Sequence, residues 1–232
     1  MTGLDGNEAT LLLAVDTCGS EGSIALGRVL DGQMELVGEA RLAGGEYAAL
    51  LMKAIADLLS AAGAAGGDLA GIVAVAGPGS FTGIRIGLAT VKGLAEVVGL
   101  PVVAVSRLAL LAEAGGASTA VLDAHRGQFY CRIGDGTARE MLLTAGEING
   151  MGGLAGRVAV CEETVAQLLE ELYGEPELVR VEPPSAALAL RFSLGKWRAG
   201  EFADVATLDG YYLRGADAKV SAKSGQAAGA RC

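Results

Sequence analysis

Short apolar runs and longer helical periods alternate along the first half of the chain, and their spacing predicts its elements. Three apolar runs separated by glycine-containing turns open the chain, which is typical of an antiparallel meander. Two longer segments with apolar residues at helical spacing follow, and each stops at a glycine. The expected elements are strands at 10–17, 23–30 and 34–42, a helix at 46–62, a strand at 71–77, a helix at 82–98, a strand at 101–106 and a short helix at 107–115.

The second half repeats this order. An apolar run ends at Asp123 as the first run of the chain ends at Asp16, and in each case a turn and an outgoing strand follow. Further strand–helix pairs begin near 157 and 177 and match the later elements of the first half. The stretch TAGEINGMGGLAG is too rich in glycine to form the long helix that follows the first meander. The second copy is therefore expected to be degenerate.

The repeated order of strands and helices predicts a duplicated α/β fold in which two lobes face each other across a cleft. This is the plan of the actin-like superfamily (ASKHA, ribonuclease H-like), which includes sugar kinases and the Hsp70 ATPase domain. A single doubly wound sheet is disfavoured, because its strands would alternate with helices from the start. We expect an N-terminal lobe at 1–106, a C-terminal lobe at 107–215 whose last helix packs back on the first lobe, and a disordered tail at 216–232.

Composition and charge narrow the functions that this fold could serve. The net charge of −9 opposes direct binding of RNA or DNA, which draws its affinity from clusters of Lys and Arg. No apolar run approaches the ~20 residues of a membrane span, so we expect a cytoplasmic protein with no membrane contact. The single histidine, His125, rules out a histidine-pair metal site within the chain, and the four cysteines are too dispersed to replace it. We interpret His125 as a solvated or capping residue.

A glycine-rich loop, GPGSFTG at 77–83, stands between a buried strand and a helix. It is not a Walker A motif, because no lysine follows its last glycine, and its glycine spacing does not fit a dinucleotide fingerprint. Backbone N–H groups at a helix N-terminus favour an anion, so the loop is a candidate phosphate site. The alternative is a tight turn in which Ser80 or Thr82 caps the helix.

The stretch AVDTCGSEGSIAL offers a second candidate for the same ligand. In actin-like ATPases, an Asp at the end of the first strand and the hairpin after it face the nucleotide phosphates and the metal. Asp16, Thr17 and Ser20 stand at these places, although Asp16 and Thr17 could equally build the turn alone. The candidate nucleotide-binding set is Asp16, Thr17, Ser20, Gly77, Gly79, Ser80, Thr82 and Gly83.

The two long helices carry apolar arcs wider than the ~100° that covering one sheet face requires. Each helix is therefore expected to have a second apolar face, and the small residues Gly83, Gly87, Ala89 and Gly93 would let another helix approach closely. Burial inside the same chain is the alternative. The residues assigned to a partner interface are Tyr47, Leu51, Ile55, Leu58, Ile84, Leu88, Val91 and Leu94.

Four stretches together resemble the TsaB (YeaZ) branch of the glycoprotease-like, TsaD-related family. They are LAVDTCGSEGSIAL, VAVAGPGSFTGIRIGLATVKGLAEVVGLPVVAVSRLALLA, VLDAHRGQFY and YYLRGADAK. The resemblance is strong over 72–111 and thin between 137 and 210. Members of this branch are bacterial subunits of the machinery that makes threonylcarbamoyladenosine (t6A) at position 37 of tRNA.

The resemblance implies a non-catalytic scaffold or activator. TsaD, the transferase, holds a metal through a histidine pair on the helix after the opening meander, where this chain has Tyr47 and no histidine. It implies pairing with TsaD through the two long helices, binding of the TsaE ATPase to that pair, a homodimer when alone, and only indirect contact with tRNA. It implies no metal and no cofactor, and leaves room for weak ADP or ATP binding at a vestigial site.

Two other functions remain as alternatives. An autonomous ATPase or small-molecule kinase of the same fold would need a second carboxylate, for which Asp123 is best placed. A peptidase is disfavoured, because the chain offers neither a metal site nor an activated nucleophile.

Overall fold

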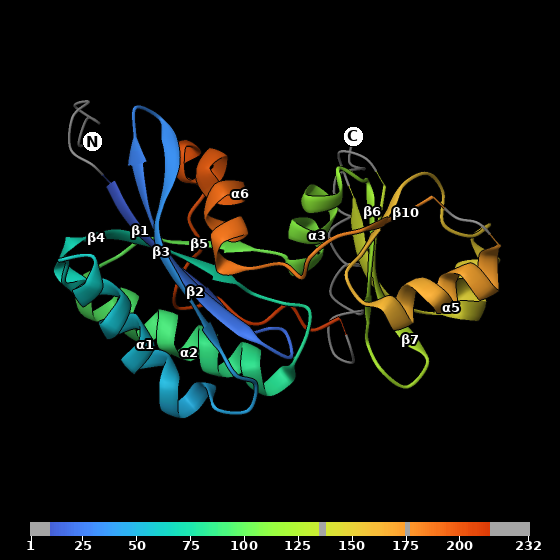
Figure 1. Ribbon diagram of the computed structural model, residues 1–232, viewed down its shortest axis with the longest axis horizontal. Helices are drawn as coiled ribbons and strands as arrows, with labels where there is room; N and C mark the ends of the chain where they lie inside the picture. Colours follow the sequence, from blue (N-terminus) through green and yellow to red (C-terminus); the bar gives the residue numbers. More distant parts are fainter. Residues whose placement is uncertain (1–9, 135–137, 175–176, 214–232) are drawn as a thin grey trace, which may run out of the picture.

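The computed structural model describes residues 10–134, 138–174 and 177–213, and the expected tail at 216–232 lies outside them. Figure 1 shows two lobes, each built on its own sheet. The chain passes from the first lobe to the second after β5 (Val102–Val105) and returns after β10 (Leu178–Arg180).

The N-terminal sheet has five strands in the order β3-β2-β1-β4-β5. β1, β2 and β3 form the expected antiparallel meander, while β4 and β5 run parallel to β1. Helices α1 and α2 cover one face of this sheet (Figure 1). Its elements are β1 (Thr10–Asp16), β2 (Gly22–Leu30), β3 (Gln33–Leu42), α1 (Tyr47–Ala61), a single 3-10 turn (Gly66–Asp68), β4 (Leu69–Val75), α2 (Phe81–Val98) and β5 (Val102–Val105).

The C-terminal sheet repeats this topology in the order β10-β9-β6-β7-β8. β6, β7 and β8 form its meander, and β9 and β10 are the parallel strands. The matching order confirms the predicted duplicated, actin-like α/β fold. Its elements are β6 (Thr119–Asp123), β7 (Gln128–Ile133), β8 (Arg139–Thr144), α4 (Ala145–Gly150), β9 (Val158–Val160), α5 (Glu163–Tyr173) and β10 (Leu178–Arg180). The six-residue α4 stands where the first lobe has the 15-residue α1, as the glycine content predicted.

The two remaining helices are exchanged between the lobes. Helix α3 (Arg107–Gly115) follows the first copy in sequence but packs on β6, β7 and β9 of the second lobe. Helix α6 (Ala186–Ala199) ends the second copy and packs on the N-terminal sheet, on the face opposite α1 and α2 (Figure 1). Each lobe is therefore a sheet between two layers of helix, and each contributes one helix to the core of the other.

Burial on the inner faces of α1 and α2 corrects the partner-interface set. Six of its eight members are fully buried in the core of the N-terminal lobe, and two are half-buried. The apolar arcs of α1 and α2 are wide, but most of their large side chains point at the sheet. Most of the outward-facing positions of the two helices carry small or charged residues. The buried members are Tyr47, Leu51, Ile55, Ile84, Leu88 and Val91, and the half-buried ones are Leu58 and Leu94.

Candidate functional site

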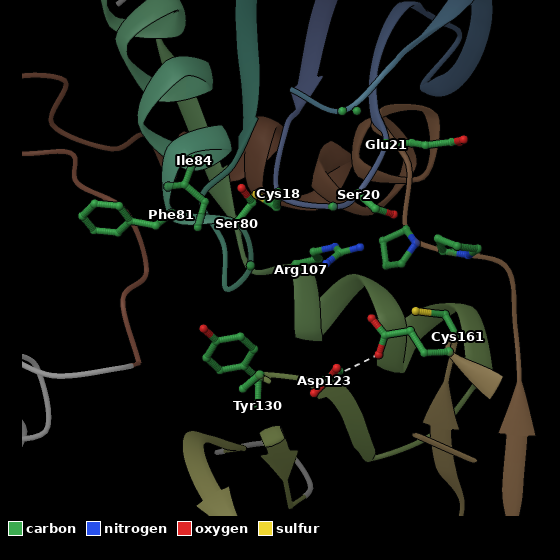
Figure 2. Close-up of a pocket in the computed structure, with 18 of the residues that line it drawn as sticks. Cys18, Ser20, Glu21, Ser80, Phe81, Ile84, Arg107, Asp123, Tyr130 and Cys161 are labelled. Atoms are coloured by element: carbon green, nitrogen blue, oxygen red, sulfur yellow. Dashed lines mark hydrogen bonds between the residues drawn. The ribbon is translucent and has the colours of Figure 1, made fainter. Parts of the chain in front are cut away.

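A cleft of about 1420 Å³ opens between the two lobes (Figure 2). Its N-terminal wall comes from the β1–β2 turn, the start of α1 and the glycine-rich loop before α2. The C-terminal wall comes from the β6–β7 turn and the segments that lead into α5 and α6. The equivalent turns of the two copies thus face each other across one space, as the duplicated fold predicts.

Asp16 does not reach this cleft. Its side chain is 2% exposed, and its Oδ1 accepts a hydrogen bond of 2.8 Å from the backbone N–H of Cys18. Burial raises the pKa of Asp16, against the opposing effects of the Arg107 charge and the Cys18 N–H. The carboxylate closes its own turn inside the protein, so its assignment to a nucleotide or metal is corrected.

Thr17 is also buried, at 1% exposure, and its hydroxyl donates to the Gly83 carbonyl at 2.7 Å. Glycine is required on α2 at this contact. A Cβ on Gly83 would lie 2.0 Å from the Thr17 carbonyl oxygen, and one on Gly87 would lie 2.2 Å from the Thr17 hydroxyl. These two glycines therefore let the β1–β2 turn lie against α2, which is a contact within the chain.

The glycine-rich loop is bonded to the same turn. Ser80 N–H donates to the Cys18 carbonyl at 2.8 Å, and a Cβ on Gly79 would lie 2.2 Å from that carbonyl oxygen. Ser80 Oγ accepts from Gly83 N–H at 3.2 Å, which confirms Ser80 as the N-cap of α2. The loop is thus explained to a large extent by close packing and helix capping.

The predicted nucleotide-binding set is split by the structure. Three members line the cleft, four are buried behind its wall, and one is exposed on the first turn of α2. The lining residues are Ser20, Gly79 and Ser80, the buried ones are Asp16, Thr17, Gly77 and Gly83, and the exposed one is Thr82.

Asp123 forms the equivalent turn in the second lobe, and it does face the cleft. Its Oδ1 accepts from the His125 N–H at 2.7 Å, and its Oδ2 lies 2.9 Å from His125 Nδ1. Glu162, just before α5, accepts from the Asp123 N–H at 2.8 Å. Burial raises the pKa of Glu162. Two carboxyl groups thus stand on this wall, with the well-exposed His125 ring beside them.

Arg107 is the lining residue that the sequence analysis missed. It is the first residue of α3, and Figure 2 shows its guanidinium between Ser20 and Asp123. A Cβ on Gly19 would lie 2.8 Å from Arg107 Nη2, so a glycine there leaves room for the guanidinium. The signal that could have identified Arg107 was its position in the sequence. It directly follows Ser106, the N-cap of α3, where the chain crosses from the first lobe to the second.

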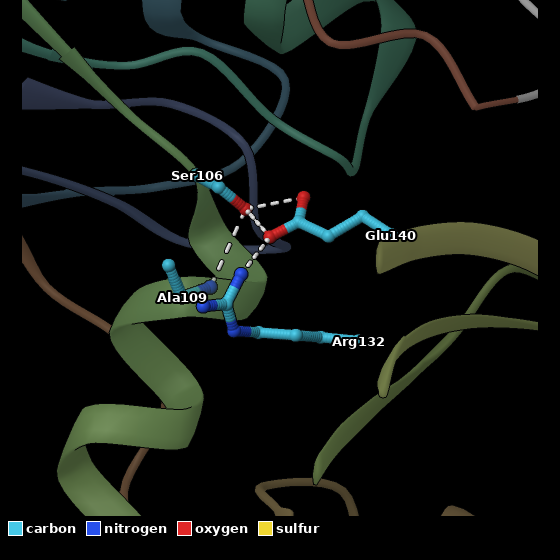
Figure 3. Close-up of polar contacts among 4 residues, drawn as sticks. All are labelled: Ser106, Ala109, Arg132 and Glu140. Atoms are coloured by element: carbon cyan, nitrogen blue, oxygen red, sulfur yellow. Dashed lines mark hydrogen bonds and ion pairs between the residues drawn. The ribbon is translucent and has the colours of Figure 1, made fainter. Parts of the chain in front are cut away.

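A second polar cluster holds the start of the exchanged helix α3 (Figure 3). Ser106 Oγ lies 2.7 Å from both carboxylate oxygens of Glu140 on β8 and accepts from the Ala109 N–H at 3.3 Å. Arg132 on β7 pairs with the same carboxylate at 3.1 Å. Because the Glu140 side chain is only 7% exposed, this cluster fixes the crossing point of the chain against the second meander.

Over residues 10–134, 138–174 and 177–213, no three or more His, Cys, Asp or Glu side chains gather closely enough to hold a metal ion. Within the same ranges, every helix is too short or too polar to cross a membrane.

Comparison with known proteins identifies the family. The family model of TsaD, tRNA N6-adenosine threonylcarbamoyltransferase, matches residues 41–156, which is half of the chain. The tRNA threonylcarbamoyladenosine biosynthesis protein TsaB of Bacillus subtilis is 43% identical over 83 residues, or 34% of this chain and 36% of that protein. TsaB of Escherichia coli is 34% identical over 125 residues, or 51% of this chain and 52% of that protein.

The chain thus spans between about a third and a half of the length of these curated relatives. Among solved structures, YeaZ from Pseudomonas aeruginosa is 27% identical and superposes with a TM-score of 0.69. That match covers 88% of this chain and 100% of the YeaZ chain. The chain therefore belongs to the family of TsaD, tRNA N6-adenosine threonylcarbamoyltransferase, and the relatives that it matches carry the names TsaB and YeaZ.

Proposed function

We propose that this chain is a non-catalytic scaffold and activator of t6A37 formation in tRNA. In this role it pairs with the TsaD transferase in the cytoplasm, the TsaE ATPase joins that pair, and the chain pairs with itself when alone. The two curated relatives are named as tRNA threonylcarbamoyladenosine biosynthesis proteins, which supports a role for this chain in the same pathway. The acidic net charge supports indirect contact with tRNA.

The observation that carries this proposal is the outward surface of α1 and α2. Large apolar side chains remain exposed there, including Met52 at 52% and Val97 at 87%. Small residues lie between them, and a Cβ on Gly93 of α2 would meet nothing within 4 Å. Close approach of another helix needs such small residues, and exposed apolar side chains supply the area to bury. We define this outer face by its exposed residues Ala49, Leu50, Met52, Ala56, Ala89, Gly93 and Val97.

The buried turn supports the non-catalytic part of the proposal. Asp16 has the position from which an actin-like ATPase would hold its nucleotide and metal, yet its side chain is shielded and bonded to its own turn. We propose that the residual nucleotide set is vestigial, so that any ADP or ATP binds weakly. Ser20, Gly79 and Ser80 are the members of the set that line the cleft and could contact such a ligand.

The alternative of an autonomous ATPase or kinase needs two carboxylates that reach one ligand. The cleft offers Asp123 and Glu162 on one wall, while Asp16 on the other is buried. ATP turnover by the isolated chain that is abolished by Asp123→Ala would favour this alternative over the scaffold.

Reconstitution of t6A synthesis tests the proposal. The cognate TsaD and TsaE, a tRNA that carries the target adenosine, threonine, bicarbonate and ATP would be combined with the enzyme that makes the threonylcarbamoyl adenylate. Modified nucleoside is then measured by mass spectrometry. We expect t6A only when this chain is present together with TsaD. Equal t6A without this chain, or t6A made by this chain without TsaD, would contradict the proposal.

A further inference from the structure

Arg107 is buried in the wall of the interlobe cleft without the partners that a guanidinium needs. The residue is 9% exposed, and its Nε–H is buried with no hydrogen-bond acceptor. In the part of the chain that the structure describes, no carboxylate lies within the 4.0 Å of an ion pair with Arg107, and no hydrogen bond joins its guanidinium to the protein. The Nε–H is therefore a buried donor without an acceptor, on a guanidinium whose N–H groups form a rigid fork.

A buried guanidinium with an unpaired donor is unfavourable for the free energy of the folded protein. A buried polar group without a hydrogen-bond partner destabilises the folded state, and a charged group does so more strongly. Nearby acidic groups offset only part of this cost. Burial lowers the pKa of Arg107, but the charges of the groups around it, with that of Asp16 the strongest, together raise it by more, so the guanidinium stays charged. The charge is thus balanced at a distance, while the buried Nε–H remains without an acceptor.

The surroundings of Arg107 indicate what would satisfy these donors. The cleft in front of the guanidinium holds about 1420 Å³, which is ample for a metabolite-sized ligand. The 18-residue helix α2 begins at the same cleft, with Gly79 and Ser80 in the lining. The N-terminus of such a helix favours negative charge. Two independent features of this wall therefore favour an anion.

We propose that the cleft binds a small molecule through an oxyanion, a phosphate or carboxylate group, that Arg107 holds with its planar pair of N–H donors. Both groups match the guanidinium fork, which forms two parallel charge-assisted hydrogen bonds. The hydroxyl of Ser20 and the first turn of α2 line the same space and contribute further donors. This site lies on the crossing point between the lobes, since Arg107 begins the exchanged helix α3. It shares Ser20 and the start of α2 with the cleft-lining members of the vestigial set, and Arg107 is the residue that it adds.

Calorimetric titration of the purified full-length chain tests this proposal. Inorganic phosphate, ADP and succinate are titrated separately at constant ionic strength, and chloride serves as the blank. Arg107→Met removes the guanidinium while keeping an apolar stem of similar length. Arg41→Gln is the matched control, because Arg41 lines the same cleft but is exposed, with its side chain 78% accessible in a loose pair with Glu21. Both variants remove one positive charge.

We expect saturable binding of at least one of the three anions, and the best binder tells phosphate from carboxylate chemistry. Arg107→Met should weaken that binding about tenfold or more, as the loss of charge-assisted hydrogen bonds implies, while Arg41→Gln should change it by less than about threefold. Absence of saturable binding up to about 10 mM of each anion, well above a millimolar Kd, would overturn the proposal. Equal weakening by the two variants would overturn it too, because it would indicate diffuse charge.

Arg107→Lys keeps the proposal testable should Arg107→Met fail to fold. Lysine retains the charge but replaces the fork by a point charge, so weaker binding is expected and unchanged affinity would overturn the site. All titrations use this chain without TsaD. Their failure would leave the role in tRNA modification intact, and failure of the reconstitution would leave this site intact.

Discussion

The turns at Asp16 and Asp123 have the same local structure and opposite surroundings. In both, the aspartate at the end of the first strand accepts a hydrogen bond from the N–H two residues further on. Asp16 is 2% exposed, whereas the Asp123 side chain is 37% exposed and faces the cleft. The difference arises from the next helix, because α2 brings Gly83 and Gly87 against Thr17, while the second lobe places Glu162 beside its turn.

The two turns share a local structure that the duplicated fold explains, but they differ in whether the aspartate is exposed to a ligand. The aspartate at this position is sufficiently explained by the hydrogen bond that it accepts within the turn, and that bond is present in both copies. Its availability for chemistry depends on whether the following helix packs over it. In the first lobe α2 covers the turn with one face, and its other face remains exposed. In the second lobe the turn remains open to the cleft, with Glu162, just before α5, beside it.

The largest expected effect comes from disrupting the contact that shields the first turn. Gly83→Ala places a Cβ 2.0 Å from the Thr17 carbonyl oxygen, so we expect a loss of about 3 kcal/mol in the free energy of unfolding, as for overpacked sites. Gly93→Ala on the same helix meets nothing within 4 Å and should gain about 0.5–1 kcal/mol from helix propensity. Urea denaturation of both variants measures the difference, and equal stabilities would show that the contact is loose.

A smaller effect, with a characteristic pH dependence, is expected at the buried aspartate itself. Asp16→Asn keeps an acceptor oxygen for the Cys18 N–H and removes the ionisable group. Burial raises the pKa of Asp16 in the folded protein above the ordinary value of 3.8. The contribution of this group to the stability of the wild type is therefore most favourable below pH 3.8 and is lost as the pH rises through the raised pKa. Asp16→Asn should therefore gain stability relative to wild type as the pH rises above 3.8.

Urea denaturation at several pH values checks this expectation. Asp123→Asn is the matched control, because it removes a charge from a side chain that water can reach. A fall in the relative stability of Asp16→Asn with rising pH would contradict a buried, unfavourably ionised Asp16.

The smallest effect concerns the cap of the short helix that distinguishes the second lobe. Thr144 caps α4 by accepting from the Glu147 N–H, and Glu147 bonds back to the Thr144 N–H and hydroxyl. Thr144→Ala should cost about 1 kcal/mol. The bonds from Thr144 lower the pKa of Glu147, so this carboxylate stabilises the fold above its ordinary value of 4.5 and loses that contribution as pH falls through the lowered pKa.

Thermal unfolding at pH 7 and at pH 3 measures both parts of this prediction. The difference between wild type and Thr144→Ala should shrink at the lower pH. A difference that is larger at pH 3 would contradict the capping box.

Most of the fold could be predicted from the sequence, because it follows from local patterns. The meander, the strand–helix order and its repetition are visible as apolar runs, turn glycines and matching aspartates. The glycine-rich stretch before residue 157 correctly predicted a shortened second copy. The boundary expected between residues 106 and 107 put α3 in the C-terminal lobe, where the structure has it packed, although a nine-residue helix by itself carries no sign of which sheet it covers.

The candidate site was predicted less well, for two physical reasons. The width of an apolar arc shows that a helix has much to bury but not which side faces the sheet, so Leu51 and Leu88 were placed on the wrong face. A motif gives residue types without their exposure, so Asp16 appeared available although it is buried. Arg107 was missed because its role depends on the cleft, which forms only when the two lobes come together.

The affinity of this chain for its cognate TsaD, measured by calorimetry, tests the outer face of α1 and α2 most directly. Gly93→Arg adds a long charged side chain to that face, and Gly146→Arg adds the same side chain to α4, where a Cβ likewise meets nothing within 4 Å. We predict that Gly93→Arg weakens binding by more than about tenfold, as for a residue at the centre of an interface, while Gly146→Arg binds like the wild type. Undiminished binding by Gly93→Arg, with its fold intact, would contradict the account.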